Sequence, residues 1–404
     1  MIDYLLGAGH DIDSFFDKQP SHAPFADILV SFVATFSESI LADSSLRRFP
    51  DLVALGFWMR SSQLELLRKQ FTLSSPAGRV RVARGNVLHF APANVDTLFA
   101  YSLFISLLLG NRNLVRVSER ENPVQGEIIR LLRTLLARND FSKLSDDLAI
   151  VRYPHDNRIT AQLSAECDCR VIWGGDNSVS TISTISISPR ATEIKFADKW
   201  SLALLDAQSI LDLAPEQLQQ LGRHFINDSY WYGQQACSSP RMVVWQGTEL
   251  TASRAQSRFW TVTDELLQSF VHRLEDSDLV NKFAASCEIA ALHSCRIRQG
   301  MNNLLTRIEF SDLDSRLFSK HCGSGLFYEH VTDNLVDLKK IITRQTQTLS
   351  YFGIDTDKLK SIIIQANRGI DRIVPVGQAL DFDILWDGYD LFEELTRGIV
   401  LRRG

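Results

Sequence analysis

The sequence predicts an α/β fold, in which a parallel sheet carries helices on both faces. The main observation is that short apolar runs alternate with longer amphipathic segments from about residue 80 onward. Strands separated by helical crossovers of that length form parallel sheets. The second observation is composition, because 45% of the 404 residues are hydrophobic and 23% are charged, as in ordinary globular proteins. A chain of this length corresponds to roughly two to three domains.

The first 79 residues read as a helix-rich segment, because apolar residues recur three and four positions apart over 25–41 and 52–71. The strands predicted after it lie at 87–90, 114–117, 148–153, 170–173, 193–196, 202–205 and 242–245. The helices predicted after it lie at 96–109, 123–137, 158–165, 215–225, 265–274 and 279–293. Parallel sheets bind ligands beyond the carboxyl ends of their strands, so residues that follow strands are the first candidates for a site.

Charge and cysteine content exclude several classes of protein. The formal net charge is −5, which gives no overall basic footprint for nucleic acid. Neither His-Glu-x-x-His nor a paired Cys-x-x-Cys occurs, so we expect no metal site. The chain starts without a signal-peptide pattern, and its longest apolar stretch, 98–109, is too short to span a bilayer. Six cysteines are few for this length, which favours free thiols in a reducing compartment, so we expect a cytoplasmic protein.

One cysteine is a candidate nucleophile. Cys237 lies in a run of small and polar residues, YGQQACSSPR over 232–241, between a predicted helix and a predicted strand. A nucleophilic thiol needs access and local positive potential, and a loop lined by backbone N–H groups supplies both. The alternative is a buried cysteine that packs as a small hydrophobe. The close pair Cys167 and Cys169 leads into a strand, and we expect it to be structural.

Asn94 is a candidate for a second catalytic group. It follows the first predicted strand in APAN, residues 91–94, just before a helix. Its side-chain amide could donate a hydrogen bond to a developing oxyanion. It could instead cap the helix, a position that asparagine favours.

Two later strand ends carry features of nucleotide sites. Arg116 and Glu119 lie at the end of the second predicted strand, where a cation and an acid could face a nucleotide ribose or be solvated loop charges. Gly174 and Gly175 follow another strand in WGGDNSV, residues 173–179. Glycines there would let a pyrophosphate approach a helix N-terminus. Glycines also punctuate many turns, and no strict Gly-x-Gly-x-x-Gly or Walker sequence occurs.

In chain order these fragments resemble the aldehyde dehydrogenase superfamily. The closer resemblance is to the LuxC-type acyl-CoA reductases, the reductases of the bacterial bioluminescence fatty-acid reductase. The superfamily resemblance is carried by a Pro-x-Asn at a strand end, a Gly-Asn followed by four residues and a basic residue, a Gly-containing turn, and Gln-x-Cys-x-x-x-Arg. The closer resemblance is carried by the Asn94 helix, QACSSP over 235–240, and the tail FDILWDGYD over 382–390. The order and spacing of these motifs carry the resemblance, which covers roughly residues 80 to 400.

The resemblance implies an aldehyde dehydrogenase-like fold, in which a Rossmann-type parallel-sheet cofactor domain is joined to an α/β catalytic domain. Four segments are then expected: a helix-rich N-terminal segment 1–79, a nicotinamide-cofactor-binding domain 80–208, a catalytic domain 209–370 with the nucleophilic cysteine, and a C-terminal segment 371–404. Superfamily members pair through added strands. The resemblance therefore implies a homo-oligomer to which the C-terminal segment contributes.

The resemblance also assigns roles by position. Cys237 matches the catalytic thiol, and Asn94 matches the oxyanion-hole amide. The positions that match cofactor-binding residues are Pro92, Ala93, Arg116, Ser118, Glu119, Gly174, Gly175 and Asp176. Asp176 stands where the family has a serine. The best match for a ligand of the nicotinamide ribose is the stretch 322–325.

The implied activity is NADPH-dependent reduction of an acyl-CoA or acyl-protein thioester to an aldehyde. The resemblance also implies that a partner acyl-protein synthetase could supply the acyl group. Arg116 could hold the 2′-phosphate of NADPH bidentately, whereas Glu119 favours NADH. Oxidative aldehyde dehydrogenases hydrolyse the thioacyl enzyme with a glutamate base. The matching stretch, 195–198, lacks that base, and Glu193 lies two residues earlier. The alternatives are an oxidative aldehyde dehydrogenase, an acyl-phosphate reductase, and a non-catalytic acyl-binding or scaffold subunit.

Overall fold

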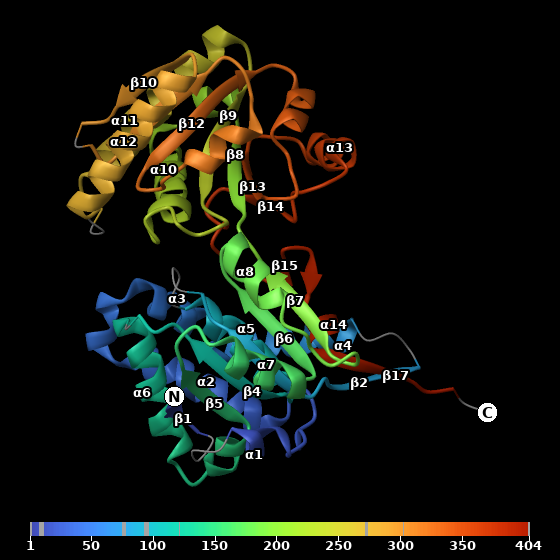
Figure 1. Cartoon of the computed structure of the whole chain (residues 1–404). Coiled ribbons are helices and arrows are strands. Elements are labelled where there is room, and N and C mark those ends of the chain that lie inside the picture. Colours follow the sequence, from blue (N-terminus) through green and yellow to red (C-terminus); the bar gives the residue numbers. More distant parts are fainter. Residues whose placement is uncertain are drawn as a thin grey trace. The chain divides into compact units, whose positions relative to one another are not determined.

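A computed structural model of the chain (Figure 1) comprises two compact units. The first unit consists of Met1–Ala197 and Phe382–Gly404, and the second of Asp198–Asp381. The structure describes residues 2–7, 12–74, 78–92, 97–120, 122–270, 274–301 and 303–402. Each unit has its own central sheet, so the chain crosses twice from one unit to the other.

The first unit is built on a six-stranded sheet with the order β1-β5-β4-β3-β6-β7. Its strands are β1 (Asp3–Leu6), β3 (Asn86–Phe90), β4 (Arg112–Val117), β5 (Leu148–Arg152), β6 (Cys169–Trp173) and β7 (Thr192–Phe196). The edge strand β1 runs antiparallel to β5, and the other pairs are parallel. The predicted α/β class with a parallel sheet is therefore confirmed.

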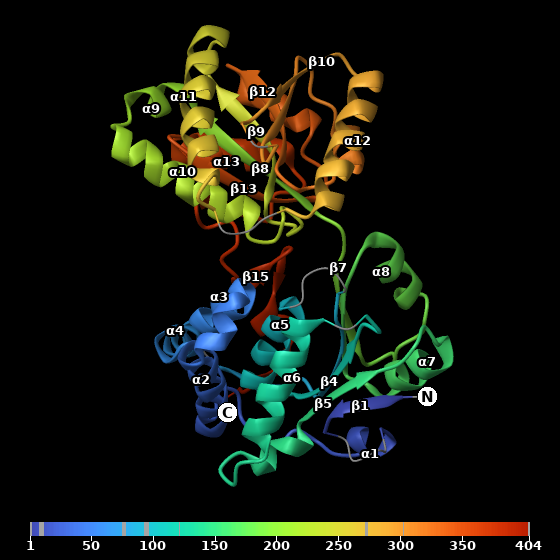
Figure 2. The same ribbon diagram turned by 90° about the vertical axis from the view of Figure 1, so that its left-hand side faces the viewer.

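Helices cover both faces of this sheet (Figure 2). One face packs against α2 (Asp27–Ala42), α3 (Pro50–Trp58), α4 (Ser61–Leu73), α5 (Leu98–Leu108) and α6 (Pro123–Leu136). The other face packs against α1 (Asp13–Phe16), α7 (Asn157–Glu166) and α8 (Asp176–Ser183). Local sequence explains these helices. In α6, for example, Asn122 caps the first turn by accepting the N–H of Val124 at 2.7 Å, and Pro123 occupies the first position.

Both chain termini belong to the first unit. The helix-rich segment 1–79 shares one core with the sheet, since the ring of Phe36 in α2 packs against that of Phe104 in α5 at a centroid distance of 4.7 Å. The chain after Phe382 adds β15 (Leu385–Trp386), β16 (Tyr389–Asp390), α14 (Leu391–Glu394) and β17 (Thr396–Val400). β17 pairs antiparallel with β2 (Arg79–Ala83) as a two-stranded ribbon (Figure 1).

The second unit is built on a seven-stranded sheet with the order β10-β11-β12-β9-β8-β13-β14. Its strands are β8 (Trp200–Asp206), β9 (Pro240–Gln246), β10 (Cys295–Gln299), β11 (Thr306–Phe310), β12 (Leu326–Thr332), β13 (Thr346–Phe352) and β14 (Arg372–Pro375). Only the edge strand β10 is antiparallel to its neighbour within this sheet, as the described pairings show.

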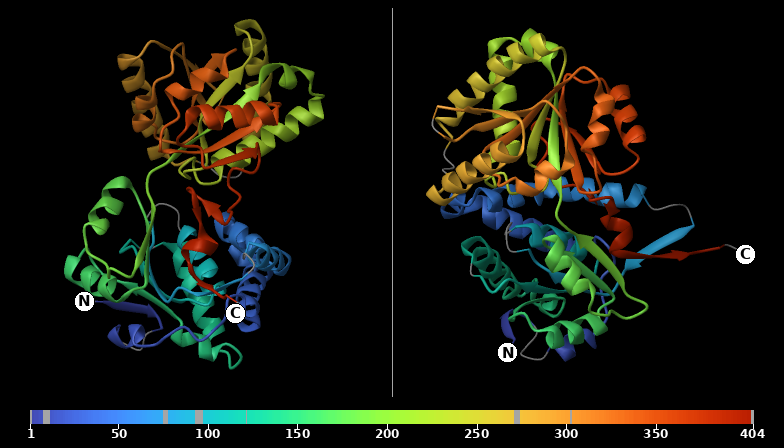
Figure 3. Two further views of the ribbon diagram at one scale, coloured as in Figure 1. Left: turned by 90° about the vertical axis from the view of Figure 1, so that its right-hand side faces the viewer. Right: turned by 45° about the horizontal axis from the view of Figure 1, so that its top comes forward.

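Two layers of helices also enclose the second sheet (Figure 3). One face is covered by α9 (Ala207–Asp212), α10 (Pro215–Tyr230) and α11 (Glu249–Leu267). The other is covered by α12 (Asp276–Leu292), α13 (Thr356–Ala366) and the short turns Ser315–Lys320 and Leu335–Lys340. Each layer buries a separate apolar cluster against the strands.

Two features of the fold differ from the sequence-based expectations. The predicted strand 202–205 lies within β8, which pairs with β9 and β13 of the second sheet rather than with the cofactor-side sheet. The unit boundaries accordingly fall at 197/198 and 381/382, instead of 208/209 and 370/371. A run that is apolar throughout, as 202–205 is, can be buried in either sheet, so its pattern does not reveal its partners.

The helix predicted over 265–274 is wrong in its bounds. The chain is already helical from Glu249, and α11 ends at Leu267. Its buried face includes Ala252, Ala255 and Phe259, which recur at helical spacing. The small side chains and the polar residues between them make that face inconspicuous in the sequence.

Candidate active site

The predicted cofactor residues come together at one edge of the first sheet. The chain passes from β3 outward to β4 and β5, then returns to β6 on the other side of β3. Phe90, at the end of β3, pairs with Arg116 on one side and Ile172 on the other. Pro92, Arg116 and Gly174 therefore follow neighbouring parallel strands at the point where the strand order reverses, which is where such sheets bind nucleotides.

Arg116 is half-buried at the end of β4. One of its terminal nitrogens donates to the carbonyl of Tyr153 at 3.0 Å, and its guanidinium carbon lies 5.3 Å from the centroid of that ring. Burial lowers the pKa of Arg116, against the opposing effects of Tyr153 and Glu119. Ser118 accepts the N–H of Arg120 at 3.2 Å, and Glu119 is exposed. The charge of Arg116 is thus fixed in place beside an exposed acid.

The glycine turn after β6 leads directly into α8. Gly174 donates its N–H to the carbonyl of Phe196 at 3.1 Å, and a Cβ at Gly174 would approach the Cβ of Ser178 to 3.3 Å. Gly175 is the N-cap residue of α8 and makes no side-chain cap hydrogen bond. Uncapped N–H groups at a helix N-terminus fit the pyrophosphate of a dinucleotide. Asp176 is exposed in the first turn of the same helix.

Pro92 is buried at the end of β3. Its neighbour Ala91 donates an N–H to the carbonyl of Arg116 at 2.9 Å, which joins this turn to the end of β4. The predicted site residues Ala93 and Asn94 lie outside the residues that the structure describes. Their assigned roles stay predictions.

In the second unit, the candidate catalytic groups gather at the amino edge of the sheet. Cys237 precedes β9, the stretch 322–325 precedes β12, and Gln345 precedes β13. These strands are parallel, so the segments before them meet at one edge. The rule applied to the sequence places ligand sites after strands, so it did not predict that these three segments meet before their strands. The available signal was the small and polar composition of the segments that precede strands.

The loop that carries Cys237 is held by its backbone. Ser201 of β8 donates its hydroxyl to the carbonyl of Cys237 at 2.6 Å, and the same hydroxyl oxygen accepts the N–H of Thr348 at 3.0 Å. Ser239 donates its N–H to the carbonyl of Ala236 at 3.0 Å. Cys237 itself is half-buried and is present as a thiol, outside any disulfide. A fixed backbone with a partly accessible thiol is suited to a nucleophile.

Gln234 joins the Cys237 loop to the stretch 322–325. This buried side chain donates to the carbonyls of Pro240 and Leu326 at 2.9 and 2.8 Å, and accepts the N–H of Gly325 at 3.0 Å. Gly325 has φ +78°, and a Cβ there would lie 2.0 Å from the carbonyl oxygen of Leu304, so this position requires glycine. Three backbone polar atoms are satisfied by one amide group, which fixes the two loops together.

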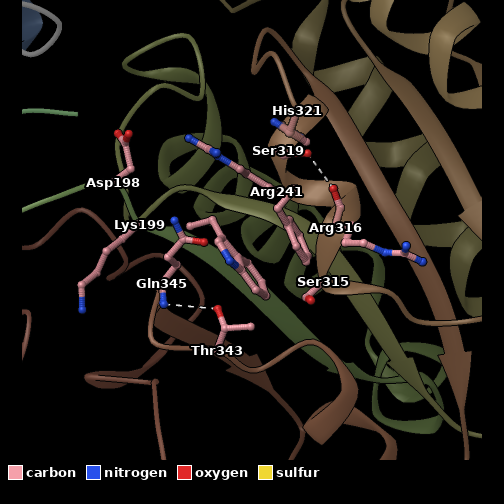
Figure 4. Close-up of a pocket in the computed structure, with 11 residues that line it drawn as sticks. Asp198, Lys199, Arg241, Ser315, Arg316, Ser319, His321, Thr343 and Gln345 are labelled. Atoms are coloured by element: carbon pink, nitrogen blue, oxygen red, sulfur yellow. Dashed lines mark hydrogen bonds between the residues drawn. The ribbon is translucent and has the colours of Figure 1, made fainter. Parts of the chain in front are cut away.

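A cavity of about 540 Å³ opens beside these loops (Figure 4). Arg241, four residues after Cys237, extends between Asp198 and His321, and no hydrogen-bond acceptor reaches its buried Nε among the described residues. The side chains of Lys199 and Arg316 reach away from it in Figure 4, each toward a carboxylate of its own, Asp371 and Asp314 respectively.

Arg241 supplies positive potential near the nucleophile. Burial lowers the pKa of Arg241, and nearby Cys237 is first among the groups that oppose this shift. The guanidinium stays protonated because arginine does not lose its proton in proteins. A cation beside a thiol favours the thiolate, which is the nucleophilic form.

His321, which also lines the cavity, is a neutral imidazole. Its Nδ1 accepts the N–H of Gly323 at 3.1 Å, so its Nε2 carries the proton and donates to the carbonyl of Leu326 at 2.8 Å. Burial, followed by the positive charge of Arg241, holds the pKa of His321 well below its ordinary value. Both ring nitrogens are engaged by backbone groups, so His321 serves to hold the loop before β12.

Glu193, in the first unit, forms ion pairs with Arg170 and Lys195. Its carboxylate accepts from Nε of Arg170 at 2.6 Å and from Lys195 at 2.8 Å, and Ser183 donates to it at 3.2 Å. Burial raises the pKa of Glu193, but the hydrogen bonds from Lys195 and Arg170 outweigh it and leave the pKa below its ordinary value. A carboxylate held in this way is a poor general base.

Two negative findings apply to the described part of the chain. No group of three or more His, Cys, Asp and Glu side chains there could hold a metal ion. No helix in the same residues has the length and apolar character needed to cross a membrane. All six cysteines are present as thiols.

The fold is that of the aldehyde dehydrogenases. A NAD-dependent benzaldehyde dehydrogenase from Corynebacterium glutamicum superposes with a TM-score of 0.65 at 13% sequence identity, covering 99% of this chain and 95% of that chain. A NAD-dependent aldehyde dehydrogenase from Sinorhizobium meliloti superposes with a TM-score of 0.67 at 11% identity, covering 95% of this chain and 84% of that chain. The predicted aldehyde dehydrogenase-like fold is therefore confirmed.

Within that fold class, the chain belongs to the acyl-CoA reductase (LuxC) family, whose sequence model matches residues 63–398. A long-chain acyl-protein thioester reductase from Aliivibrio fischeri is 22% identical over 302 residues. The match covers 73% of this chain and 58% of that relative, so the chain spans little more than half of the relative's length. The family resemblance read from the motifs is thus confirmed.

Proposed function

We propose that this protein reduces an acyl thioester to an aldehyde at the expense of NADPH, through a thioacyl intermediate on Cys237. The observation that carries the proposal is the Cys237 loop, whose backbone is held in place and whose half-buried thiol has Arg241 nearby. Membership of the acyl-CoA reductase family supports it, as does the activity for which the Aliivibrio relative is named.

The chemistry divides between Cys237 and the groups around it. The Cys237 thiolate attacks the thioester carbon, the oxyanion is held by the backbone N–H of Cys237 and the Asn94 amide, and the donor thiol leaves with a proton. When bound, NADPH supplies the hydride that reduces the thioacyl group. The resulting thiohemiacetal collapses, so that the aldehyde leaves and Cys237 is regenerated. The ion pairs of Glu193 with Arg170 and Lys195 support reduction over hydrolysis, because no free base is left there to activate water.

The cofactor proposal rests on the strand ends of the first sheet. The uncapped N-terminus of α8 would hold the pyrophosphate, and Gly174 and Gly175 would let it approach. Pro92 and Ala93 keep the cofactor-binding role that the resemblance assigns to them. Arg116, Ser118 and Glu119 would face the adenosine ribose. NADPH is the proposed cofactor because Arg116 can pair with a 2′-phosphate, and NADH is the alternative that Glu119 favours.

Turnover with acyl thioesters tests the proposed function directly. Purified protein is mixed with NADPH and a panel of acyl-CoAs, and the loss of absorbance of the reduced nicotinamide is followed. We expect aldehyde and oxidised cofactor in equal amounts. An acyl phosphate and an aldehyde with oxidised cofactor serve as parallel substrates. Faster turnover of either would replace the proposal by acyl-phosphate reduction or aldehyde oxidation, and no turnover with any donor would favour a scaffold.

The physiological donor is proposed to be an acyl-protein, with acyl-CoA as a surrogate. The Aliivibrio relative is named for a protein thioester substrate, and an acyl-protein synthetase is the class of partner that would supply one. A thioester presented by a protein thiol and one presented by CoA offer the same reacting carbon to Cys237.

Replacing Arg116 by alanine should raise the KM for NADPH more than the KM for NADH. Loss of a cation paired with a phosphate removes a charge-assisted hydrogen bond of about 1.5–3 kcal/mol, so the KM ratio should change roughly tenfold or more. Initial-rate kinetics with both cofactors measure it. Arg158→Ala, which removes an exposed arginine paired with Asp156, is the matched control. Equal changes in both KM values would show that Arg116 does not touch the 2′-phosphate.

We also propose that the chain forms a homo-oligomer through its C-terminal segment. The end of β17 exposes apolar side chains: Val400 is 61% exposed, and the next residue, Leu401, is 58% exposed. Edge strands with exposed apolar side chains tend to pair with another chain. Deleting residues 398–404 should reduce the molar mass measured by light scattering without lowering kcat. A deletion from residue 371 would be uninformative, because it removes the buried Phe382 and Leu391 from the core of the first unit. An unchanged molar mass would exclude this segment as the contact.

A further inference from the structure

The carboxylate of Asp228, on α10, holds the segment through which the chain leaves the second unit. Asp228 is 1% exposed. Its Oδ2 accepts the N–H of Gly377 at 2.7 Å, and its Oδ1 accepts the N–H of Ala379 at 3.0 Å. An ionised carboxylate is a pure acceptor, so it satisfies both N–H donors at once. We call residues 376–381 the crossover segment.

The crossover segment is also fixed by its carbonyl groups and by close packing. Arg372 donates to the carbonyls of Ala379 and Asp381 at 3.3 and 2.8 Å. Gly377 has φ +100°, and a Cβ there would lie 2.9 Å from the Cβ of His224 on α10. The chain therefore lies directly against the helix at a position where only glycine is unstrained.

The backbone of Asp228 reaches the nucleophile loop. Its carbonyl oxygen accepts the hydroxyl of Ser239 at 2.8 Å. Ser239 is buried, lies two residues after Cys237, and closes the turn by donating its N–H to Ala236. One residue of α10 therefore contacts both the crossover segment, through its side chain, and the Cys237 loop, through its main chain.

We propose that Asp228 is a positioning residue for Cys237, which ties the nucleophile loop and the crossover segment to one point of α10. The proposal rests on the proposed function in taking Cys237 as the reacting thiol. A displacement of the crossover segment would move the Asp228 carboxylate and tilt the last turn of α10. That turn includes the Asp228 carbonyl, which accepts the Ser239 hydroxyl. A misplacement of about 1 Å at a reacting group is enough to lower a rate by about 10²-fold.

The proposal concerns the ionised form of Asp228, so its pKa determines the pH at which the proposal is tested. Burial raises the pKa of Asp228 to about 7, against the hydrogen bonds from Gly377 and Ala379. Asp381 raises the pKa further and Arg372 lowers it, while His224 lies on the same helix. Below this pKa the carboxyl is protonated, and one oxygen becomes a donor without an acceptor. Measurements at pH 8 therefore sample the ionised group that accepts both N–H bonds.

The test compares Asp228→Asn with Arg372→Met. The second substitution removes the hydrogen bonds that Arg372 donates to carbonyls of the crossover segment. Two quantities are measured at pH 8: kcat and KM for acyl-CoA reduction, and the rate at which iodoacetamide alkylates Cys237, followed by peptide mass spectrometry. The exposed Cys287 of the same unit serves as an internal standard. Asp206→Ala is the matched control, because it removes the N-cap of α9 at the opposite edge of the sheet.

We expect both crossover variants to lower kcat about tenfold, with the KM for NADPH unchanged, and to change the Cys237/Cys287 alkylation ratio at least threefold. Asp206→Ala should lower Tm with neither effect. A fall in Tm equal to that of the control, with kcat and the alkylation ratio unchanged, would reduce Asp228 to a structural role. Alkylation needs no turnover. The alkylation ratio therefore shows whether Asp228 positions the thiol even if the protein does not reduce acyl-CoA.

Discussion

Replacing Cys237 by alanine should abolish both acyl transfer to the protein and aldehyde formation. The thiol is the proposed attacking group, and His321 cannot replace it, because both of its ring nitrogens are engaged by backbone groups. Loss of the nucleophile typically removes several orders of magnitude of rate. The fold should survive, since Cys237 is half-buried and its loop is held by backbone contacts that alanine retains.

Labelled acyl-CoA followed by a denaturing gel measures the acyl transfer. Cys287→Ala, which removes an exposed thiol of the same unit, should keep both the label and the activity. Label that stays bound to the Cys237→Ala protein at the wild-type level would place the nucleophile elsewhere. That result would remove the basis for assigning the loop between α10 and β9.

Replacing Asn94 by alanine should lower kcat by about 10²- to 10³-fold if its amide stabilises the oxyanion, which is the range found when one such donor is removed. The KM for acyl-CoA should change little, because the hydrogen bond strengthens only as charge develops on the oxygen. Steady-state kinetics and thermal unfolding of the same protein measure both consequences.

The helix-cap alternative for Asn94 makes the opposite prediction. Loss of a cap destabilises the protein by about 1 kcal/mol and leaves kcat nearly unchanged. Asn122 provides the reference, because its side chain caps α6 through the N–H of Val124. A kinetic profile of Asn94→Ala that matches Asn122→Ala would remove Asn94 from the oxyanion hole.

Much of the first unit could be predicted because its signals are local. The predicted strands 87–90 and 114–117 are short apolar runs beside turn residues. Each lies within an observed strand, and the observed strands begin one and two residues earlier, at Asn86 and Arg112. The Gly174 turn and Arg116 follow such strands, so the general rule for parallel sheets already places them at a common edge. The motif order then indicated the family before any tertiary contact was known.

The remaining features depend on contacts between distant residues. The apolar run of β8 does not reveal that it pairs with β9 and β13, because burial on both faces gives the same pattern in either sheet. Glu193 reads as a candidate base in the sequence, but the fold sets it between Arg170 and Lys195. Whether a carboxylate is free to take a proton depends on such partners, which periodicity does not encode.

The sequence alone therefore determined the α/β class, the motif order and the identity of the candidate nucleophile, because helix and strand periods, turn residues and side-chain chemistry are properties of neighbouring residues. The tertiary structure decided which segments meet. It brought the loops before β9 and β12 together through Gln234, and it set Asp228 between the crossover segment and Ser239. These contacts join residues up to about 150 positions apart, and they form because buried donors and acceptors must be satisfied after the sheets have assembled.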